Sequence, residues 1–425
     1  MAVRKIRLGN GVRVIMERMP SLKSVAVGIW VNVGARDEQL GQEGITHFLE
    51  HMMFKGTRRR SAVRISQEID MLGGEMNAFT THETTTFYVK VLDQQLTQAL
   101  DLLADLFHHS QFDVREIERE KQVVLEEIRT VRDDPEDFVQ ELHAQAVWRD
   151  HPLGRSILGE PATMERIGRQ DLVQYVKTHY RPEHTLITIA GNVTWSSLLP
   201  LIDELFGSWT APPWPNGAPP TRRPPAVHGG ISVHAKRLEQ THLCLGFKGL
   251  PLGHPDRYAA NTLNVLLGGG VSSRLFQEVR ERRGLAYTIY SQLSSFTDGG
   301  TLTIYAATNA KEAASVIAVI CREIQKLRRR PVGHQELERA KNQMKGTLML
   351  NLEGTYGRMT KLAKDEISHG RHVTLEEMIA EIDKLSSTQL QRVSRELLDF
   401  GSMTVTALGP LPKGDFVKRV SNLVP

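Results

Sequence analysis

The spacing of apolar and polar residues along the chain first indicates short strands. Two runs, Lys5 to Leu8 and Val12 to Met16, flank Asn10-Gly11, a pair that accepts the positive φ of a hairpin turn. Val25 to Val33 has the length and the apolar content of a buried strand. Glu75 to Thr80 is predicted to form a further short strand. The chain should therefore contain a sheet near its start.

Amphipathic helices lie between and after these strands. One helix is predicted to begin at Ser61 and to end at Gly73-Gly74, because serine caps helix starts and glycine accepts the left-handed conformation at helix ends. A longer helix is predicted from Asp113 to Asp133, with Asp113 as N-cap. Its apolar residues recur at helical spacing and should form a buried stripe: Ile117, Val124, Leu125 and Ile128.

The chain also contains an internal repeat, divided by a proline-rich segment. Residues 211–227 include seven prolines, which can neither donate to a sheet nor continue a helix, so this segment is predicted to be a linker. The stretch Glu118–Gln122 is echoed by Glu338–Asn342. Late in each half a helix runs into a strand, at residues 172–190 and 390–408. We therefore predict one fold used twice, with an N-terminal domain at 1–210, the linker at 211–227 and a C-terminal domain at 228–425.

Composition is that of an ordinary globular protein. The chain has 425 residues, enough for two or more domains, with 40% hydrophobic and 24% charged residues. No apolar run reaches the roughly 18 residues that a membrane helix needs, so no membrane association is predicted. The start of the chain lacks an apolar secretory region, and Cys244 and Cys321 are isolated. These features favour a reducing, cytoplasmic location.

The net charge of +4 raises the question of nucleic-acid binding. Two basic clusters, Arg58 to Arg60 and Arg328 to Arg330, are not interleaved with aromatic residues. The first lies in a predicted loop after a predicted helix, and the second closes a helix where cations complement the dipole. We therefore interpret both clusters as solvated surface and predict no nucleic-acid partner.

The sequence His47-Phe48-Leu49-Glu50-His51 is the most specific chemical feature of the chain. Positions i, i+3 and i+4 share one face of a helix, so His47 and His51 can bind one metal ion with Glu50 beside it. The order H-x-x-E-H is the motif of the inverzincin peptidases. The alternative is a pair of surface histidines on an amphipathic helix.

A catalytic zinc ion needs a third protein ligand, which leaves one position open for water. Glu120 and Glu127 lie seven residues apart on one face of the helix predicted from Asp113, and either could reach a metal against that face. The alternative for each is a solvated ion-pair face, because basic residues alternate with them: Arg119, Lys121 and Arg129.

The chain resembles the pitrilysin family of zinc endopeptidases over nearly its whole length, and it looks closest to single-chain bacterial relatives of the mitochondrial processing peptidase. The family pairs H-x-x-E-H with a glutamate ligand some 76 residues later and an acidic residue seven positions before that ligand, a spacing matched here by Glu127 and Glu120. The resemblance implies that zinc is bound by His47, His51 and Glu127. It implies that Glu120 orients the site from behind the ligands.

The resemblance also implies an α+β fold and a substrate site. Each of the two homologous domains should be a mostly antiparallel sheet packed against helices. Asn77-Ala78-Phe79-Thr80 matches the family's N-A-x-T element, a sheet edge on which extended peptide is laid. The alternative for Asn77 is a turn residue. Arg280 and Tyr287 match an Arg and Tyr pair that contacts substrate, with Tyr287 on the oxyanion and Arg280 on a peptide carbonyl.

The expected function is zinc-assisted peptide hydrolysis with Glu50 as the general base and one Zn²⁺ per chain. In the alignment set by the repeat, Glu120 faces Ala340 and Glu127 faces Thr347, so the chemistry should be confined to the first half. The family further suggests a homodimer acting on peptide substrates. The alternatives are a catalytically idle structural core subunit and a peptide-binding chaperone of the same fold.

Overall fold

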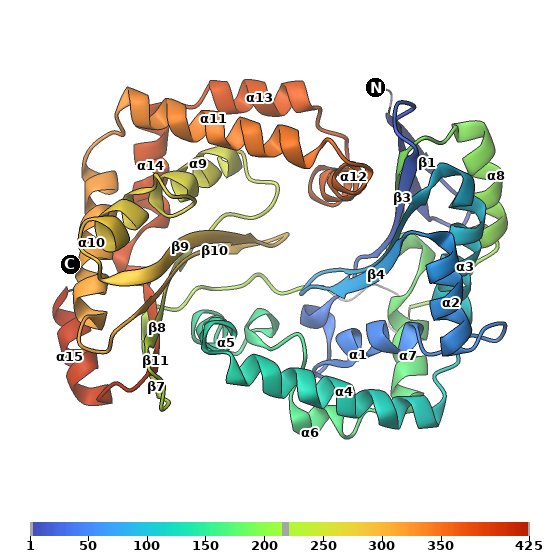
Figure 1. The fold of residues 1–425 in the computed structure, drawn as a ribbon, viewed down its shortest axis with the longest axis horizontal. Coiled ribbons are helices and arrows are strands. Elements are labelled where there is room, and N and C mark those ends of the chain that lie inside the picture. Colours follow the sequence, from blue (N-terminus) through green and yellow to red (C-terminus); the bar gives the residue numbers. More distant parts are fainter. Residues whose placement is uncertain (1–2, 215–220, 424–425) are drawn as a thin grey trace. The chain divides into compact units, whose positions relative to one another are not determined.

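The computed structural model describes residues 3–214 and 221–423, so residues 215–220 of the predicted linker lie outside the described residues. Two compact units are present, and each combines three stretches of the chain (Figure 1). Unit 1 contains the described residues of 1–130, 155–222 and 350–372. Unit 2 contains those of 131–154, 223–349 and 373–425. Each unit therefore includes a segment from the other half of the chain.

Unit 1 is built on a six-stranded sheet with the order β1-β2-β6-β3-β5-β4. Its neighbouring strands are antiparallel except for β2 and β6, which run parallel. The predicted strands near the start of the chain are all present, and the strand from Glu75 to Thr80 has the predicted bounds. The strands are β1 (Val3–Arg7), β2 (Arg13–Arg18), β3 (Ser24–Val31), β4 (Glu75–Thr80), β5 (Thr85–Leu92) and β6 (Thr185–Gly191).

Unit 2 is built on a five-stranded sheet with the order β7-β11-β8-β10-β9. This is the order of the last five strands of the first sheet, and its one parallel pair, β7 with β11, falls at the same place. The predictions of a duplicated fold and of mostly antiparallel sheets are confirmed. The strands are β7 (Gly230–Ala235), β8 (Thr241–Lys248), β9 (Ala286–Ser295), β10 (Gly300–Thr308) and β11 (Thr404–Gly409).

Helices cover both sheets and enclose a separate apolar core in each unit. The helix predicted from Ser61 is α2, capped by the Ser61 side chain and ended by Gly73 at φ 60°. The helices of the first half are α1 (Ile45–Met53), α2 (Ala62–Leu72), α3 (Leu96–His109), α4 (Val114–Asp133), α5 (Pro135–Val147), α6 (Pro161–Met164), α7 (Arg169–His179) and α8 (Trp195–Phe206). Those of the second half are α9 (Arg257–Leu267), α10 (Ala313–Arg329), α11 (His334–Asn351), α12 (Thr355–His369), α13 (Leu375–Asp383), α14 (Ser387–Leu397) and α15 (Lys413–Leu423).

The two halves exchange a helix. α12, from the second half, packs against β2, β3 and β6 in unit 1, and α5, from the first half, packs against β8 and β11 in unit 2 (Figure 1). Ion pairs fix α12 in place, because buried Glu366 binds Lys5 at 2.7 Å and Arg13 at 3.2 Å. The compact units therefore cut across the division of the chain predicted from the linker.

Glycines allow the exchanged helices to approach the sheets closely. A Cβ at Gly28 in β3 would lie 2.7 Å from Trp30 Nε1 and 3.0 Å from Sδ of Met359 on α12. A Cβ at Gly246 in β8 would lie 2.3 Å from Nε2 of His143 on α5. Real Cβ atoms do not approach other atoms so closely, so each position requires glycine for the observed packing.

The sequence echo between the halves has a structural cause. In α4 and α11 a buried lysine binds the glutamate three residues before it and a main-chain carbonyl at the end of a later short helix. Lys121 binds Glu118 at 2.9 Å and the carbonyl of Glu165 at 3.1 Å, and Lys341 binds Glu338 at 3.0 Å and the carbonyl of Asp383 at 3.1 Å. The similar sequences of the two helices thus reflect the same pair of lysine contacts in both halves.

The expectation that Arg58 to Arg60 form solvated surface is wrong for Arg60. Its side chain is only 12% exposed and forms ion pairs with Glu68 at 2.7 Å, Asp101 at 2.6 Å and Asp105 at 2.7 Å. Glu68 lies on α2, and Asp101 and Asp105 lie on α3, more than 40 residues further along the chain, so no local pattern indicated the α3 partners. This arginine joins the loop after α1 to two helices.

Among the described residues, no helix is both long and apolar enough to cross a membrane.

Candidate metal centre

Helix α1, which carries the H-x-x-E-H motif, is fixed at its start by close packing and by a buried acid. Gly44 precedes the helix at φ 92°, and a Cβ there would lie 2.5 Å from the carbonyl oxygen of Leu158. The carboxyl group of Glu38 accepts hydrogen bonds of 2.9 Å from the N–H groups of Gly44 and Thr46. These N–H groups would otherwise lack partners at the helix start.

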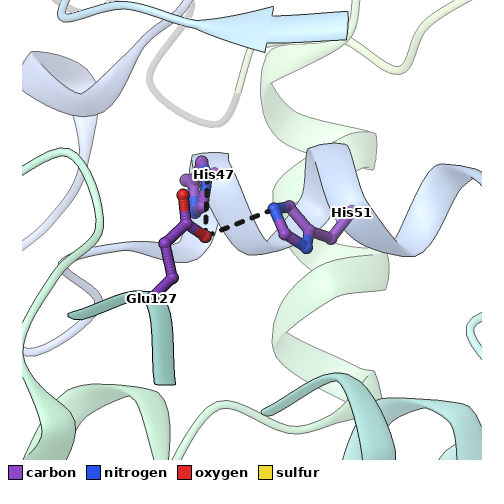
Figure 2. A group of neighbouring side chains, drawn as sticks. All are labelled: His47, His51 and Glu127. Atoms are coloured by element: carbon purple, nitrogen blue, oxygen red, sulfur yellow. Dashed lines mark ion pairs between the residues drawn. The ribbon is translucent and has the colours of Figure 1, made fainter. Parts of the chain in front are cut away.

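The structure brings together the three side chains that the sequence predicts as metal ligands. His47 and His51 project from the same face of α1, with ring centroids 4.6 Å apart. Glu127 reaches them from α4, with its Oε2 atom 3.8 Å from His47 Nε2 and 3.7 Å from His51 Nε2 (Figure 2). The three ligand atoms all lie within 4.8 Å of one another. No other group of this kind was found in the part of the chain that the structure describes.

These separations fit a shared zinc ion. They are too long for hydrogen bonds, which need about 3.2 Å or less. Ligand atoms about 2.0–2.2 Å from one tetrahedral zinc ion stand roughly 3.3–3.6 Å apart, close to what is observed. His47 is buried and its Nδ1 atom has no hydrogen-bond partner. Burial, with the charge of His51, lowers the pKa of His47 to about 3, so its ring is neutral and keeps a lone pair for a metal.

Glu120 holds the second histidine. Its Oε1 atom lies 2.9 Å from Nδ1 of His51, and its side chain is buried. Burial alone would raise the pKa of Glu120, but hydrogen bonds from His51 and Lys55 bring it below its usual value. Burial alone would lower the pKa of His51, but the hydrogen bond and charge of Glu120 raise it. An ionised Glu120 accepts a hydrogen bond from the Nδ1–H group of His51, which leaves the lone pair on Nε2, the atom that faces Glu127.

Glu50 lies on the same face of α1 as the two histidines. Burial raises its pKa, while a hydrogen bond of 2.6 Å from Thr80 Oγ1 to Glu50 Oε2 acts in the opposite direction. A carboxylate whose pKa is raised toward neutrality is suited to accept and return a proton. The arrangement places such a group one turn from His47 and next to His51.

The segment Asn77-Ala78-Phe79 lies in β4, the edge strand of the first sheet, which among the described residues pairs with β5 alone. β4 runs beside α1. Asn77 Oδ1 accepts a 2.8 Å hydrogen bond from the N–H of Ala78, and Phe79 packs edge-on against Trp30 with centroids 5.8 Å apart. The predicted peptide-binding edge is thus next to the predicted metal ligands.

Arg280 and Tyr287 lie together in unit 2. The guanidinium of Arg280 is 4.4 Å from the ring centroid of Tyr287, which is 74% exposed near the start of β9. Arg280 itself lies in a π-helical stretch, Phe276–Glu281. π-Helical stretches are rare in proteins, and many of those that occur lie at functional sites.

Two contacts of the centre were missed by sequence reasoning. Thr80 was noted only as part of a peptide-binding element, although it binds Glu50. Lys55 was not singled out, although its Nζ atom lies 2.6 Å from Glu120 Oε2. Both contacts join segments that are far apart in sequence, so no periodic pattern could have indicated them.

The sequence matches the family described as "Insulinase (Peptidase family M16)" over residues 13–161 and "Peptidase M16 inactive domain" over residues 166–344. An uncharacterized zinc protease of Bacillus subtilis is 41% identical over 412 residues, covering 96% of this chain and 100% of that protein. One from Mycobacterium tuberculosis is 38% identical, covering 94% and 91%. One from Streptomyces coelicolor is 36% identical, covering 96% and 90%.

Solved structures share the fold. A crystal structure of a protease from Helicobacter pylori has a TM-score of 0.89 at 23% identity and covers 96% of this chain and 99% of that one. A chain in complex III2 from Candida albicans has a TM-score of 0.85 at 19% identity, covering 100% of both. The sequence matches and the fold agree with the resemblance drawn from the motif. The chain therefore belongs to peptidase family M16, the insulinase and pitrilysin-like zinc proteases, and is a zinc metallopeptidase.

Proposed function

We propose that this chain is an endopeptidase that cleaves unfolded peptides bound in extended form, with one zinc ion held by His47, His51 and Glu127. The observation that carries the proposal is the convergence of these three ligand atoms within 4.8 Å, with Glu50 on the same helix face as the two histidines. Three protein ligands leave one position open, as catalytic rather than structural zinc sites do.

Each residue of the site has a separate role in hydrolysis. When bound, zinc polarises a water molecule and the peptide carbonyl, which makes attack possible at neutral pH. Glu50 accepts a proton from the attacking water and returns it to the leaving amine. Thr80 keeps one oxygen of Glu50 in place, and Glu120 keeps His51 in the correct tautomer. The roles of Tyr287 on the oxyanion and Arg280 on a substrate carbonyl remain predictions from the family resemblance.

The edge strand β4 supports the choice of extended substrates. A peptide added beside β4 would gain main-chain hydrogen bonds whatever its side chains are. Such binding tolerates varied sequences and requires a segment that is free of its own secondary structure. The position of β4 beside α1 would lay that peptide next to Glu50.

The second candidate function is a structural core subunit, since a chain of complex III2 from Candida albicans has the same fold. The third is a peptide-binding chaperone. The convergence of His47, His51 and Glu127, with Glu50 on the same helix as both histidines, favours the enzyme, because neither alternative requires a general base beside three metal ligands. A homodimer remains a prediction that light scattering tests.

The variant Glu50→Gln tests the proposal. We expect it to bind zinc as the wild type does and to lose turnover of a quenched basic peptide, because the amide cannot accept the proton. Glu126→Gln, an exposed glutamate paired with Arg129 on α4, is the matched control and should keep full activity. Full activity in Glu50→Gln would refute the role of Glu50. A wild-type protein that contains zinc but cuts no peptide would favour the alternatives.

A further inference from the structure

Lys55 lies two residues after the end of α1 and contacts Glu120, the carboxylate that holds His51. Its Nζ atom is 2.6 Å from Glu120 Oε2, and its side chain is 30% exposed. Its main-chain N–H donates to the carbonyl of Met52, so the end of α1 fixes the position of the Lys55 backbone. None of the sequence motifs assigned this residue a role.

The two oxygens of Glu120 have different partners. Oε1 accepts from His51 Nδ1 at 2.9 Å and Oε2 binds Lys55 at 2.6 Å. A buried carboxylate needs partners for both oxygens, because it has lost its water. The terminal torsion of a glutamate is otherwise broad, so a carboxylate held at one oxygen can turn. The lysine therefore fixes the plane of the carboxylate that orients His51.

Charge supports the same role. Glu50, Glu120 and Glu127 bring three carboxylates to a centre whose two histidines are ligands. One divalent cation and Lys55 would together balance these three charges. Lys55 places its positive charge beside Glu120, the one of these carboxylates that is neither a predicted ligand nor the predicted base.

Comparison of the two halves shows whether the contact between Lys55 and Glu120 belongs to the duplicated fold. The buried lysines Lys121 and Lys341 make the same contacts in both halves, so they belong to the duplicated fold. The position aligned with Glu120 is Ala340, which cannot accept such a contact. The pair of Lys55 with Glu120 is therefore not part of the duplicated architecture and belongs to the half that carries the predicted metal ligands.

We propose that Lys55 is a positioning residue that sets zinc affinity through Glu120, by holding the carboxylate that orients His51. The inference rests on the metal site of the proposed function. It assigns the lysine no contact with substrate.

Zinc affinity, measured by competition with a chromophoric chelator, tests this inference without using activity. We expect Lys55→Met to weaken zinc binding about 10–100-fold, the usual effect of removing a partner behind a ligand. Lys55→Arg, which keeps the charge and the donors, should recover most of the affinity. Lys345→Met is the matched control, since Lys345 is 25% exposed and binds Asp383 at 2.8 Å in unit 2. It should bind zinc as the wild type does.

A double-mutant cycle with Glu120→Gln separates positioning from general loss of structure. If Lys55 acts through Glu120, Lys55→Met should have little further effect in the Glu120→Gln protein. The absorption spectrum of the Co²⁺-loaded protein should also change in Lys55→Met and return in Lys55→Arg. Affinity within twofold of the wild type in Lys55→Met, or fully additive effects in the cycle, would overturn the inference. Failure of the wild type to bind zinc would instead overturn the proposed function.

Discussion

Thr80 Oγ1 donates a hydrogen bond of 2.6 Å to Glu50 Oε2 and so links the edge strand β4 to the metal helix α1. The same strand carries Asn77, Ala78 and Phe79, the residues predicted to hold the peptide. One hydroxyl thus connects the element expected to bind substrate with the group expected to move the proton.

Removing that hydroxyl should impair catalysis and leave metal binding unchanged. We expect Thr80→Val to lower kcat about 10–100-fold, because an unrestrained Glu50 loses part of the roughly 100-fold or greater contribution of a positioned base. Steady-state kinetics with a quenched peptide, together with zinc content, measure both effects. Thr80→Ser keeps the hydroxyl and should keep most of the activity. Equal rates for Thr80→Val and wild type would show that the contact is not used.

Glu127→Ala should abolish tight zinc binding and the stability that comes with it. A ligand that binds only the folded state at about 100 times its dissociation constant adds about 2.7 kcal/mol to the free energy of unfolding. A chelator should therefore lower the melting temperature of the wild type and leave that of Glu127→Ala unchanged. Glu126→Ala removes the adjacent exposed glutamate and should respond to the chelator like the wild type. A chelator response in Glu127→Ala would count against Glu127 as a ligand.

Gly246→Ala should destabilise the packing of α5 on the second sheet. The added Cβ would lie 2.3 Å from Nε2 of buried His143, so the helix or the strand must shift. We expect a loss of about 1–3 kcal/mol in the free energy of unfolding, the usual cost of overpacking. Denaturant titration measures it. The double variant with His143→Ala removes the clash and should lose less than the two single changes together, and simple additivity would contradict the packing argument.

His143 should make the protein sensitive to acid. Burial lowers its pKa to about 3, from an ordinary value of about 6.5. Between these two pH values the unfolded chain binds a proton at His143 and the folded chain does not. The contribution of His143 to the free energy of unfolding is therefore complete above about pH 6.5 and is lost as the pH falls toward 3. The slope is on the order of 1 kcal/mol per pH unit.

Denaturant titrations between pH 7 and pH 4 test this prediction. In His143→Gln the free energy of unfolding should fall less steeply with acid than in the wild type. His334→Gln changes an exposed histidine and should follow the wild-type curve. Identical slopes for His143→Gln and the wild type would show that the pKa of His143 does not differ between the folded and unfolded chains.

Sequence reasoning succeeded where the signal is local. The bounds of β4, the caps of α2 and the helix that carries His47, Glu50 and His51 all follow from spacing over a few residues. Helical periodicity alone places those three side chains on one face. Glu127 came from the resemblance to a family, because spacing left it equal to Glu120 as a possible ligand.

Contacts between distant segments could not be predicted in this way. An amphipathic pattern shows that α5 and α12 have an apolar face, but it does not state which sheet covers that face, and each helix packs on the sheet of the other half. The burial of Arg60 among acids on two helices is a further example.

Local propensity and periodicity thus set the elements of this chain, their buried faces and the shared helix face of His47, Glu50 and His51. Folding added the partners: Thr80 for Glu50, Lys55 for Glu120, and glycines beneath the exchanged helices. The difference arises because backbone preference acts between near neighbours, whereas packing and hydrogen-bond satisfaction depend on which buried surfaces meet.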